Sequence, residues 1–213
     1  MKRMFDLVVS AAFLVPLSPL FILVGTMIRL ESPGPIFYRG VRSGLGGRRF
    51  RIYKFRTMVM NADKIGGSST ADTDPRITKL GKQLRKFKLD ELPQLINVIK
   101  GEMSFVGPRP EVPFYTDLFT EEERAILSVR PGITDWASLW NSDEGALLAG
   151  KTDPEKYYLE HIRPEKMRLQ LAYVRQRTFC KDLVIMLQTA MTVLWRPLGR
   201  KGRLATSLMV KSA

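Results

Sequence analysis

Two adjacent carboxylates, Asp90 and Glu91, are the side chains of this sequence best suited to carry out chemistry. Proline fits the first turn of a helix, so Pro93 predicts that a helix begins near Asp90 or Glu91. Three cations bracket the pair: Arg85, Lys86 and Lys88. A helix dipole and nearby cations both favour the ionised carboxylate, which can act as a nucleophile or a metal ligand. Taken alone, the pair also fits an ordinary acidic cap at a helix start.

A second set of candidate residues is cationic and spread along the chain. The guanidinium group of arginine can donate hydrogen bonds to two phosphate oxygens at once, and lysine adds a compact positive charge. If these side chains converge on the carboxylate pair, the site is suited to a diphosphate. The set comprises Lys54 and Arg56 in KFRT, Arg85 before the pair, and Arg109 in GPRP.

The composition predicts one domain with an appendage and an anionic partner. The chain has 213 residues, with 34 Lys and Arg against 21 Asp and Glu, a formal charge of +13. Such a charge favours nucleic acid, an anionic membrane surface or phosphorylated substrates. Cys180 and His161 are single in the sequence, which excludes a disulfide framework, a Cys/His metal site and a Cys–His nucleophile pair within one chain. Both are interpreted as structural residues.

Residues 7–28 carry no charge and are long enough to cross a membrane. A straight helix of that length measures about 33 Å, against a hydrocarbon core of about 30 Å. Pro16 and Pro19 lie near its middle, where each removes a backbone donor, and Ser18 can satisfy a carbonyl that Pro19 frees. The segment is therefore predicted to bend at Ser18-Pro19.

Positive charge flanks this segment on both sides, with Lys2 and Arg3 before it and Arg29 after it. Positive residues favour the cytoplasmic side, so both ends are expected there. A re-entrant membrane helix over residues 1–30 is favoured over a spanning helix, a cleaved signal peptide or a buried core helix. Residues 31–213 are then expected to form a cytoplasmic domain, the one that contains the carboxylate pair.

The remaining pattern predicts an α+β fold that is mainly helical. Residues 36–57 read as a basic, aromatic β-hairpin around a glycine-rich turn. The segment 180–195 is predicted to be a helix that either joins the core or lies, as an amphipathic helix, on the membrane surface. The surface position is favoured because basic residues follow the segment, namely Arg196, Arg200, Lys201 and Arg203. The other expected elements are a loop at 59–76, two helices within 77–100, a loop at 101–110, a short helix at 121–128, a loop at 130–136, and a further helix in the first part of 154–195.

Three stretches together resemble one known family. They are SPGPIFYRGVRSGLGGRRFRIYKFRTM, DPRITKLGKQLRKFKLDELPQLINVIKGEMSFVGPRP and RPGITDWASL. In this order they are similar to the bacterial sugar transferase family, the monotopic phosphoglycosyl transferases that start glycan assembly on undecaprenyl phosphate. The resemblance covers the chain from Lys2 to about Leu194.

The resemblance implies a mechanism and a location. Asp90 would attack the sugar-bearing phosphate of a UDP-sugar, forming a covalent phosphosugar intermediate and releasing UMP, and undecaprenyl phosphate would then take the phosphosugar. Glu91 would assist proton or metal handling, and Mg²⁺ held by Asp90 and Glu91 would offset diphosphate charge. Lys54, Arg85 and Arg109 match the family's phosphate-binding positions. The helix would dip into the inner leaflet of the bacterial inner membrane, monotopic, with the catalytic domain facing the cytoplasm.

The same resemblance implies the partners and leaves the sugar open. They are a UDP-sugar, undecaprenyl phosphate and inner-membrane lipid, with no nucleic acid, and a homodimer is among the expected assemblies. The glycan could be O-antigen, capsule, exopolysaccharide or a glycoprotein glycan. Many family members continue PGITGW with AQVNGR, whereas this chain has PGITDWASLWNSDEG, which places Asp135, Asp143 and Glu144 in a stretch expected to face the donor.

Two other functional classes compete with this interpretation. A membrane-anchored nucleic-acid-binding protein fits the basic charge and the aromatic residues among the arginines. It leaves the acidic pair and VGPRP unexplained. A noncatalytic membrane scaffold predicts that Asp90→Asn changes nothing measurable.

Overall fold

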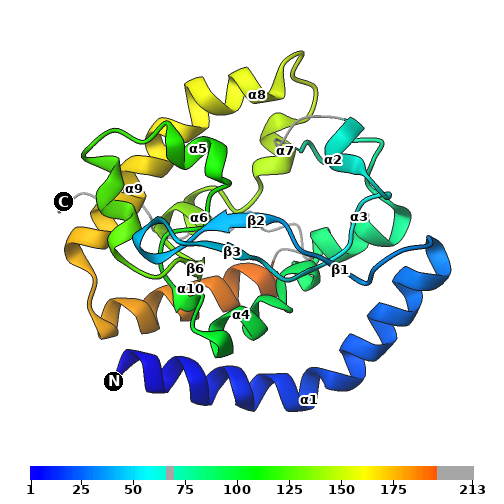
Figure 1. Ribbon diagram of the computed structural model, residues 1–213, viewed down its shortest axis with the longest axis horizontal. Helices are drawn as coiled ribbons and strands as arrows, with labels where there is room; N and C mark the ends of the chain where they lie inside the picture. The colour runs from blue at the N-terminus through cyan, green and yellow to red at the C-terminus, as the bar shows by residue number, and fades with distance from the viewer. Residues whose placement is uncertain (66–69, 196–213) are drawn as a thin grey trace.

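The computed structural model describes residues 1–65 and 70–195, and the basic residues from 196 onward that bore on the membrane-surface prediction lie outside this part. The described chain is mainly helical, with short strands near its centre (Figure 1). Its α-helices are α1 (Lys2–Glu31), α2 (Ala62–Ile65), α3 (Lys79–Lys86), α4 (Gln94–Lys100), α5 (Pro113–Asp117), α6 (Trp136–Trp140), α7 (Glu144–Leu148), α8 (Pro154–Tyr157), α9 (Arg163–Gln176) and α10 (Phe179–Trp195). Single tighter or wider turns are η1 (Leu45–Gly47), η2 (Leu89–Glu91), η3 (Glu123–Ser128) and η4 (Tyr158–Ile162).

The predicted hairpin is confirmed as two antiparallel strand pairs in succession. β2 (Val41–Ser43) pairs with β3 (Arg49–Arg51), and β1 (Phe37–Tyr38) pairs with β4 (Lys54–Phe55). The turn between β2 and β3 contains Gly46 and Gly47 at φ of 62° and 76°, a left-handed conformation that favours glycine. The glycine-rich stretch therefore closes the hairpin as its residue types predict.

A third strand pair was not predicted. β5 (Ser104–Val106) and β6 (Gly132–Thr134) run parallel, in two stretches that the glycine and proline pattern assigned to loops. Each strand has three residues, too few to show an alternation. The pairing joins residues far apart in sequence, so no local signal records it. Helices α5, α6 and α7 were also missed, because each has five residues and is too short to display a helical period. The loop predicted at 59–76 contains the one-turn helix α2.

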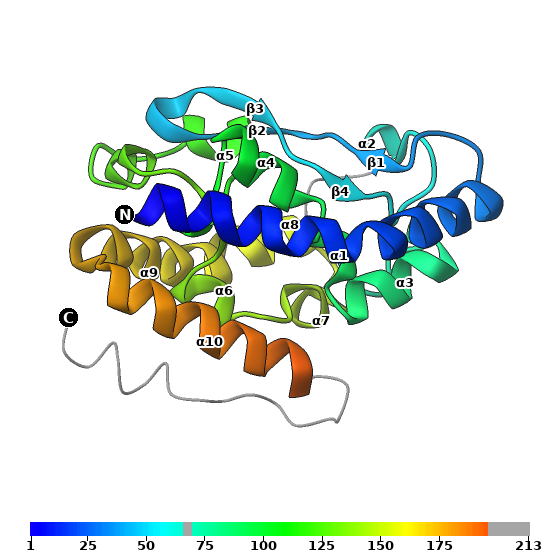
Figure 2. The ribbon, with the colours of Figure 1, turned by 90° about the horizontal axis from the view of Figure 1, so that it is seen from below.

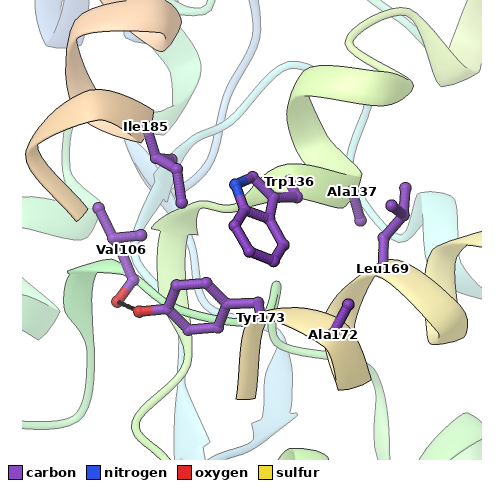
Figure 3. Close-up of a cluster of buried hydrophobic side chains, with 7 residues drawn as sticks. All are labelled: Val106, Trp136, Ala137, Leu169, Ala172, Tyr173 and Ile185. Atoms are coloured by element: carbon purple, nitrogen blue, oxygen red, sulfur yellow. Dashed lines mark hydrogen bonds between the residues drawn. The ribbon is translucent and has the colours of Figure 1, made fainter. Parts of the chain in front are cut away.

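The core beside β5 joins α6, α9 and α10 (Figure 3). Trp136 packs edge-on against Tyr173, with ring centroids 5.9 Å apart. The Tyr173 hydroxyl contacts the Val106 carbonyl oxygen at 3.2 Å and the Asp182 carboxylate at 2.7 Å. Apolar packing and these hydrogen bonds fix the end of β5, where the GPRP loop (residues 107–110) begins.

Helix α1 bends in its middle without being interrupted (Figure 1). Pro19 has no N–H to donate to the Val15 carbonyl, and the Ser18 hydroxyl donates to that same carbonyl at 2.7 Å. The predicted compensation by Ser18 is therefore present, and the predicted break takes the form of curvature within one continuous helix.

The N-terminal turns of α1 are bound to the rest of the molecule by polar contacts. Lys2 forms an ion pair with Asp182 and donates to the Val106 carbonyl at 2.8 Å. Asp6 is almost fully buried and accepts a hydrogen bond from the Ser104 hydroxyl at 2.8 Å and one from the next backbone N–H at 3.3 Å. These contacts hold α1 against β5.

The C-terminal part of α1 is bound by apolar packing. Val24 and Ile28 are buried with Phe55 and Leu84, whereas apolar side chains elsewhere on the helix are exposed, Val15 by 75%. Within the described residues, α1 is the helix that has the length and composition to cross a membrane. Both of its ends nevertheless pack on the same domain.

The Asp6 contacts predict a measurable loss of stability. Asp6→Ala leaves the Ser104 hydroxyl and a strand N–H without their acceptor, and an unsatisfied buried polar group costs about 1–3 kcal/mol. We expect a lower Tm for Asp6→Ala in detergent micelles. Asp6→Asn keeps one carbonyl acceptor and should lie between this variant and the original protein. An unchanged Tm for Asp6→Ala would show that the contacts do not stabilise the fold.

Candidate active site

The carboxylate pair lies in a tight turn between two helices. Lys88 adopts φ of 57°, in the left-handed region, and Asp90 and Glu91 follow in η2. Helix α4 begins at Gln94, so the predicted start near Asp90 or Glu91 was too early. The reversal at Lys88 ends the preceding helical segment, and Pro93 at the cap position then starts α4.

Glu91 is an anion held by two cations. Lys54 Nζ donates to Glu91 Oε1 at 2.8 Å, and Arg109 donates to both carboxylate oxygens, to Oε2 at 3.1 Å. Burial raises the pKa of Glu91, but the charges of Arg109 and Lys54 outweigh it and hold this pKa well below its usual range. Glu91 is therefore ionised, as the sequence predicted.

Asp90 lies beside this anion in a different environment. Its carboxylate is 7% exposed, and Asp90 Oδ1 has no hydrogen-bond partner among the described residues. Burial and then the charge of Glu91 raise the pKa of Asp90, against the opposing effect of Lys54 and other cations. The prediction that the surroundings favour its ionised form was wrong, because burial outweighs the cations. The result is a carboxylate oxygen without an internal partner.

Lys54, Arg85 and Arg109, three of the four predicted phosphate-binding residues, line one cleft together with the carboxylate pair, and the fourth, Arg56, lines it too. Burial lowers the pKa of Lys54, opposed by the charge of Glu91, and Glu91 raises the pKa of Arg109. Arg85 donates from Nε to the Thr57 hydroxyl at 3.0 Å. Lys54, Arg85 and Arg109 therefore lie in the same cleft as the carboxylate pair, which the sequence alone could not show.

Arg56 has a different environment from the predicted one. Its guanidinium donates to the carbonyl oxygens of Ser32 and Pro33, each at 2.7 Å, just beyond the end of α1. The strand β4 ends at Phe55, so the alternation that would place Arg56 beside Lys54 stops one residue earlier. Arg56 thus holds the end of α1, and it also lines the cleft that contains the carboxylate pair.

Asp135 also differs from its expected position facing the donor. It is fully buried and accepts hydrogen bonds from the Ser138 N–H at 2.7 Å and the Arg109 N–H at 3.2 Å. Asp135 therefore caps α6 and holds the GPRP loop, as an aspartate before an apolar run commonly does. Asp143 and Glu144, from the same stretch, do line the cleft.

A buried lysine that the sequence analysis did not single out lies in the same cleft. Lys166 Nζ is 2.6 Å from Glu111 Oε1, 3.1 Å from the Tyr158 hydroxyl and 4.0 Å from Glu144 Oε2. Burial lowers the pKa of Lys166, but Glu111 and Tyr158 outweigh it and raise this pKa overall. Lys166 comes from α9 and Glu111 follows the GPRP loop, so only the folded chain brings them together.

The carboxylate pair fits a magnesium ion that takes its other ligands from a substrate. The residues described by the structure form no group of three or more Asp, Glu, His or Cys side chains that could hold a metal. Mg²⁺ is usually held by one or two carboxylates together with substrate phosphates and water. Of the two carboxylates, Asp90 has an oxygen without a protein partner, whereas both Glu91 oxygens already accept from cations.

Comparison with known proteins shows which family the chain resembles. Residues 1–196 match the model of the bacterial sugar transferase family. The chain is 38% identical over 197 residues to a UDP-N-acetylgalactosamine-undecaprenyl-phosphate N-acetylgalactosaminephosphotransferase of Aeromonas hydrophila, covering 91% of this chain and 43% of that protein. It is 37% identical over 194 residues to the sugar transferase EpsL of Bacillus subtilis strain 168, named as uncharacterized, covering 91% of this chain and 87% of that protein.

A third relative is the UDP-glucose:undecaprenyl-phosphate glucose-1-phosphate transferase of Escherichia coli strain K12. It is 35% identical over 195 residues, covering 89% of this chain and 39% of that protein. The chain thus spans less than half the length of the Aeromonas and Escherichia relatives and most of EpsL. With a family match over nearly its whole length, this chain belongs to the bacterial sugar transferases.

Proposed function

We propose that this protein transfers a sugar 1-phosphate from a UDP-sugar to undecaprenyl phosphate and releases UMP, the first membrane step of glycan assembly. The observation that carries the proposal is the Asp90 oxygen without an internal partner, in a cleft that also presents Lys54, Arg85 and Arg109. The relatives' names supply the substrate classes, since they specify undecaprenyl phosphate and UDP-linked sugars.

The reaction proceeds in two displacements on the same phosphorus atom. An Asp90 carboxylate oxygen forms a bond to the sugar-bearing phosphorus as the bond from that phosphorus to the UMP oxygen breaks, and UMP leaves with the electron pair. A phosphate oxygen of undecaprenyl phosphate then attacks the same phosphorus and releases the Asp90 carboxylate. The second displacement regenerates the enzyme.

The other residues of the cleft bind and orient. Arg109, Lys54 and Arg85 neutralise the diphosphate oxygens, and Glu91 keeps the first two cations at the site when no substrate is bound. A Mg²⁺ ion held by Asp90 and Glu91 would offset the negative charge of the diphosphate. Asp143 and Glu144 lie along the cleft where the donor's sugar or nucleotide can reach them. This is the stretch in which the chain departs from the common family pattern.

The proposal includes a monotopic, re-entrant path for α1 at the bacterial inner membrane. A spanning helix places its ends on opposite sides of a hydrocarbon core of about 30 Å. Here Lys2 and Asp6 at one end and Ile28 at the other all contact the same domain. The exposed middle of α1 then enters the inner leaflet, and the catalytic domain, with α10 on the membrane surface, faces the cytoplasm.

Replacing the nucleophile should abolish the first displacement. Asp90→Asn removes the attacking oxygen with little change in shape, and loss of a covalent nucleophile lowers kcat by about 10³-fold or more. We expect neither UMP release nor a mass adduct on the protein when donor is supplied alone. The variant should still fold and bind membrane. Turnover at an appreciable rate in Asp90→Asn would contradict the assignment.

The raised pKa of Asp90 predicts the pH dependence of adduct formation. Asp90 keeps its proton to a higher pH than an ordinary aspartate, whose pKa is about 3.9. As the pH is lowered, the rate of single-turnover UMP release should therefore begin to decline at a pH above that of an ordinary aspartate's pKa. Lys88 lowers the pKa of Asp90, so Lys88→Gln should move this acid limb to higher pH. The exposed Lys86→Gln serves as the control. Equal shifts in the two variants would exclude this local electrostatic effect.

The bend at Pro19 can be tested by labelling the ends of α1. In a variant with Cys180 replaced, cysteines at positions 4 and 32 should both resist a membrane-impermeant maleimide applied to the periplasmic face. Pro19→Ala restores an N–H opposite the Val15 carbonyl and should straighten α1, so that position 4 is labelled in a fraction of the molecules. Ends that remain cytoplasmic in Pro19→Ala would show that this proline does not set the bend.

A further inference from the structure

The active-site cleft continues into a region lined by two helices far apart in sequence. We name this region the apolar limb and define it by matched rows at i, i+4 and i+7 on each helix, which lie on one helix face. The rows are Phe13, Leu17 and Leu20 on α1, and Met186, Ala190 and Val193 on α10. The same cleft contains Asp90 and its cations.

The arrangement of the two helices explains why this limb is present. Their N-terminal ends are joined, since Phe5 packs edge-on against Phe179 at 5.3 Å and Lys2 pairs with Asp182. Figure 2 shows α1 and α10 along the same side of the molecule, α1 continuing past the end of α10. Beyond the joint, the rows on both helices line the cleft.

Two threonines on the α10 side do not make this limb polar. The Thr189 hydroxyl donates to the Ile185 carbonyl at 2.8 Å and lies 2.7 Å from the Thr134 hydroxyl. The Thr192 hydroxyl donates to the carbonyl one turn earlier at 2.8 Å. Because both hydroxyls bond within the protein, this part of α10 needs no polar ligand.

The limb and the cationic site together complement an amphiphile with an anionic head. Lys54, Arg85 and Arg109 suit a phosphate, and the limb beside them suits a chain without polar groups. A UDP-sugar has no such chain, whereas a polyprenyl phosphate has both parts. The exposed apolar surface of α1 makes the limb accessible from the lipid phase.

We propose that the apolar limb between α1 and α10 binds the isoprenoid tail of the acceptor and so directs its phosphate toward Asp90. This inference rests on the proposed function and adds the place where the acceptor binds. One helix then has two roles, because α1 enters the lipid and forms one side of the acceptor site.

Filling the limb should weaken acceptor use without affecting the donor half-reaction. Ala190→Trp places a bulky ring among the apolar rows, and we expect the KM for undecaprenyl phosphate to rise about tenfold, a difference of about 1.4 kcal/mol. UMP release from donor alone should keep its original rate. Ala12→Trp is the matched control, on an exposed position of α1 outside the limb. An unchanged KM in a folded Ala190→Trp protein, or an equal rise in Ala12→Trp, would overturn the proposal.

Photolabelling tests the same site without turnover. A polyprenyl phosphate carrying a diazirine in its tail should label peptides from residues 13–20 and 186–193, and excess undecaprenyl phosphate should compete. Equal competition by phosphatidylglycerol would show a general lipid surface and would overturn the proposal, as would labelling centred on the exposed Leu23 and Leu187. If labelling is as expected but the protein releases no UMP with any UDP-sugar, the proposed function fails and the tail site stands.

Discussion

The arrangement of the active site depends on the ion pairs of Glu91 with Lys54 and Arg109. Burying a charge is costly unless a partner is buried with it, and here one anion and two cations are together shielded from most of the surrounding water, although the Arg109 side chain stays 32% exposed. The three residues come from β4, η2 and the GPRP loop, which are separate in the sequence. Loss of Glu91 would leave two cations in the cleft without their shared anion, so this carboxylate fixes the relative positions of the segments that line the cleft.

The neighbouring carboxylate, Asp90, has a raised pKa in part because of the charge of Glu91 in this cluster. Arg109 is bound by both Glu91 oxygens, so the cations hold the pKa of Glu91 low while burial and the charge of Glu91 raise the pKa of Asp90. Two neighbouring carboxylates whose pKa values are pushed apart have different roles, one as a fixed charge and one as a reactive group. A phosphate entering between the cations would share them with Glu91, and its arrival would place an electrophile beside the oxygen of Asp90 that has no partner.

The residue types were readable from the sequence, whereas their partners were not. The carboxylate pair, the cations Lys54, Arg85 and Arg109 and the glycine-closed hairpin follow from local composition, and the structure places these cations around one cleft with the pair. Asp135 was misplaced because it accepts from the backbone of the distant GPRP loop, and the bonds of Arg56 to the end of α1 were not foreseen because they also join distant segments. The pKa of Asp90 was predicted in the wrong direction because burial depends on the whole fold and sequence neighbours reveal only the cations.

Helix α1 is part of the frame of the active site as well as the proposed membrane anchor. Composition separates residues 1–30 from the rest, but Lys2 and Asp6 hold β5, and the chain leaves β5 directly into the GPRP loop that carries Arg109. Movement of α1 would therefore be transmitted through β5 to the cation that binds Glu91. Because the contacts of α1 with β5 and with the Phe55 cluster lie at opposite ends of the helix, a straight α1 could not keep both. Its curvature thus connects how the protein sits in lipid with how its phosphate-binding residues are held.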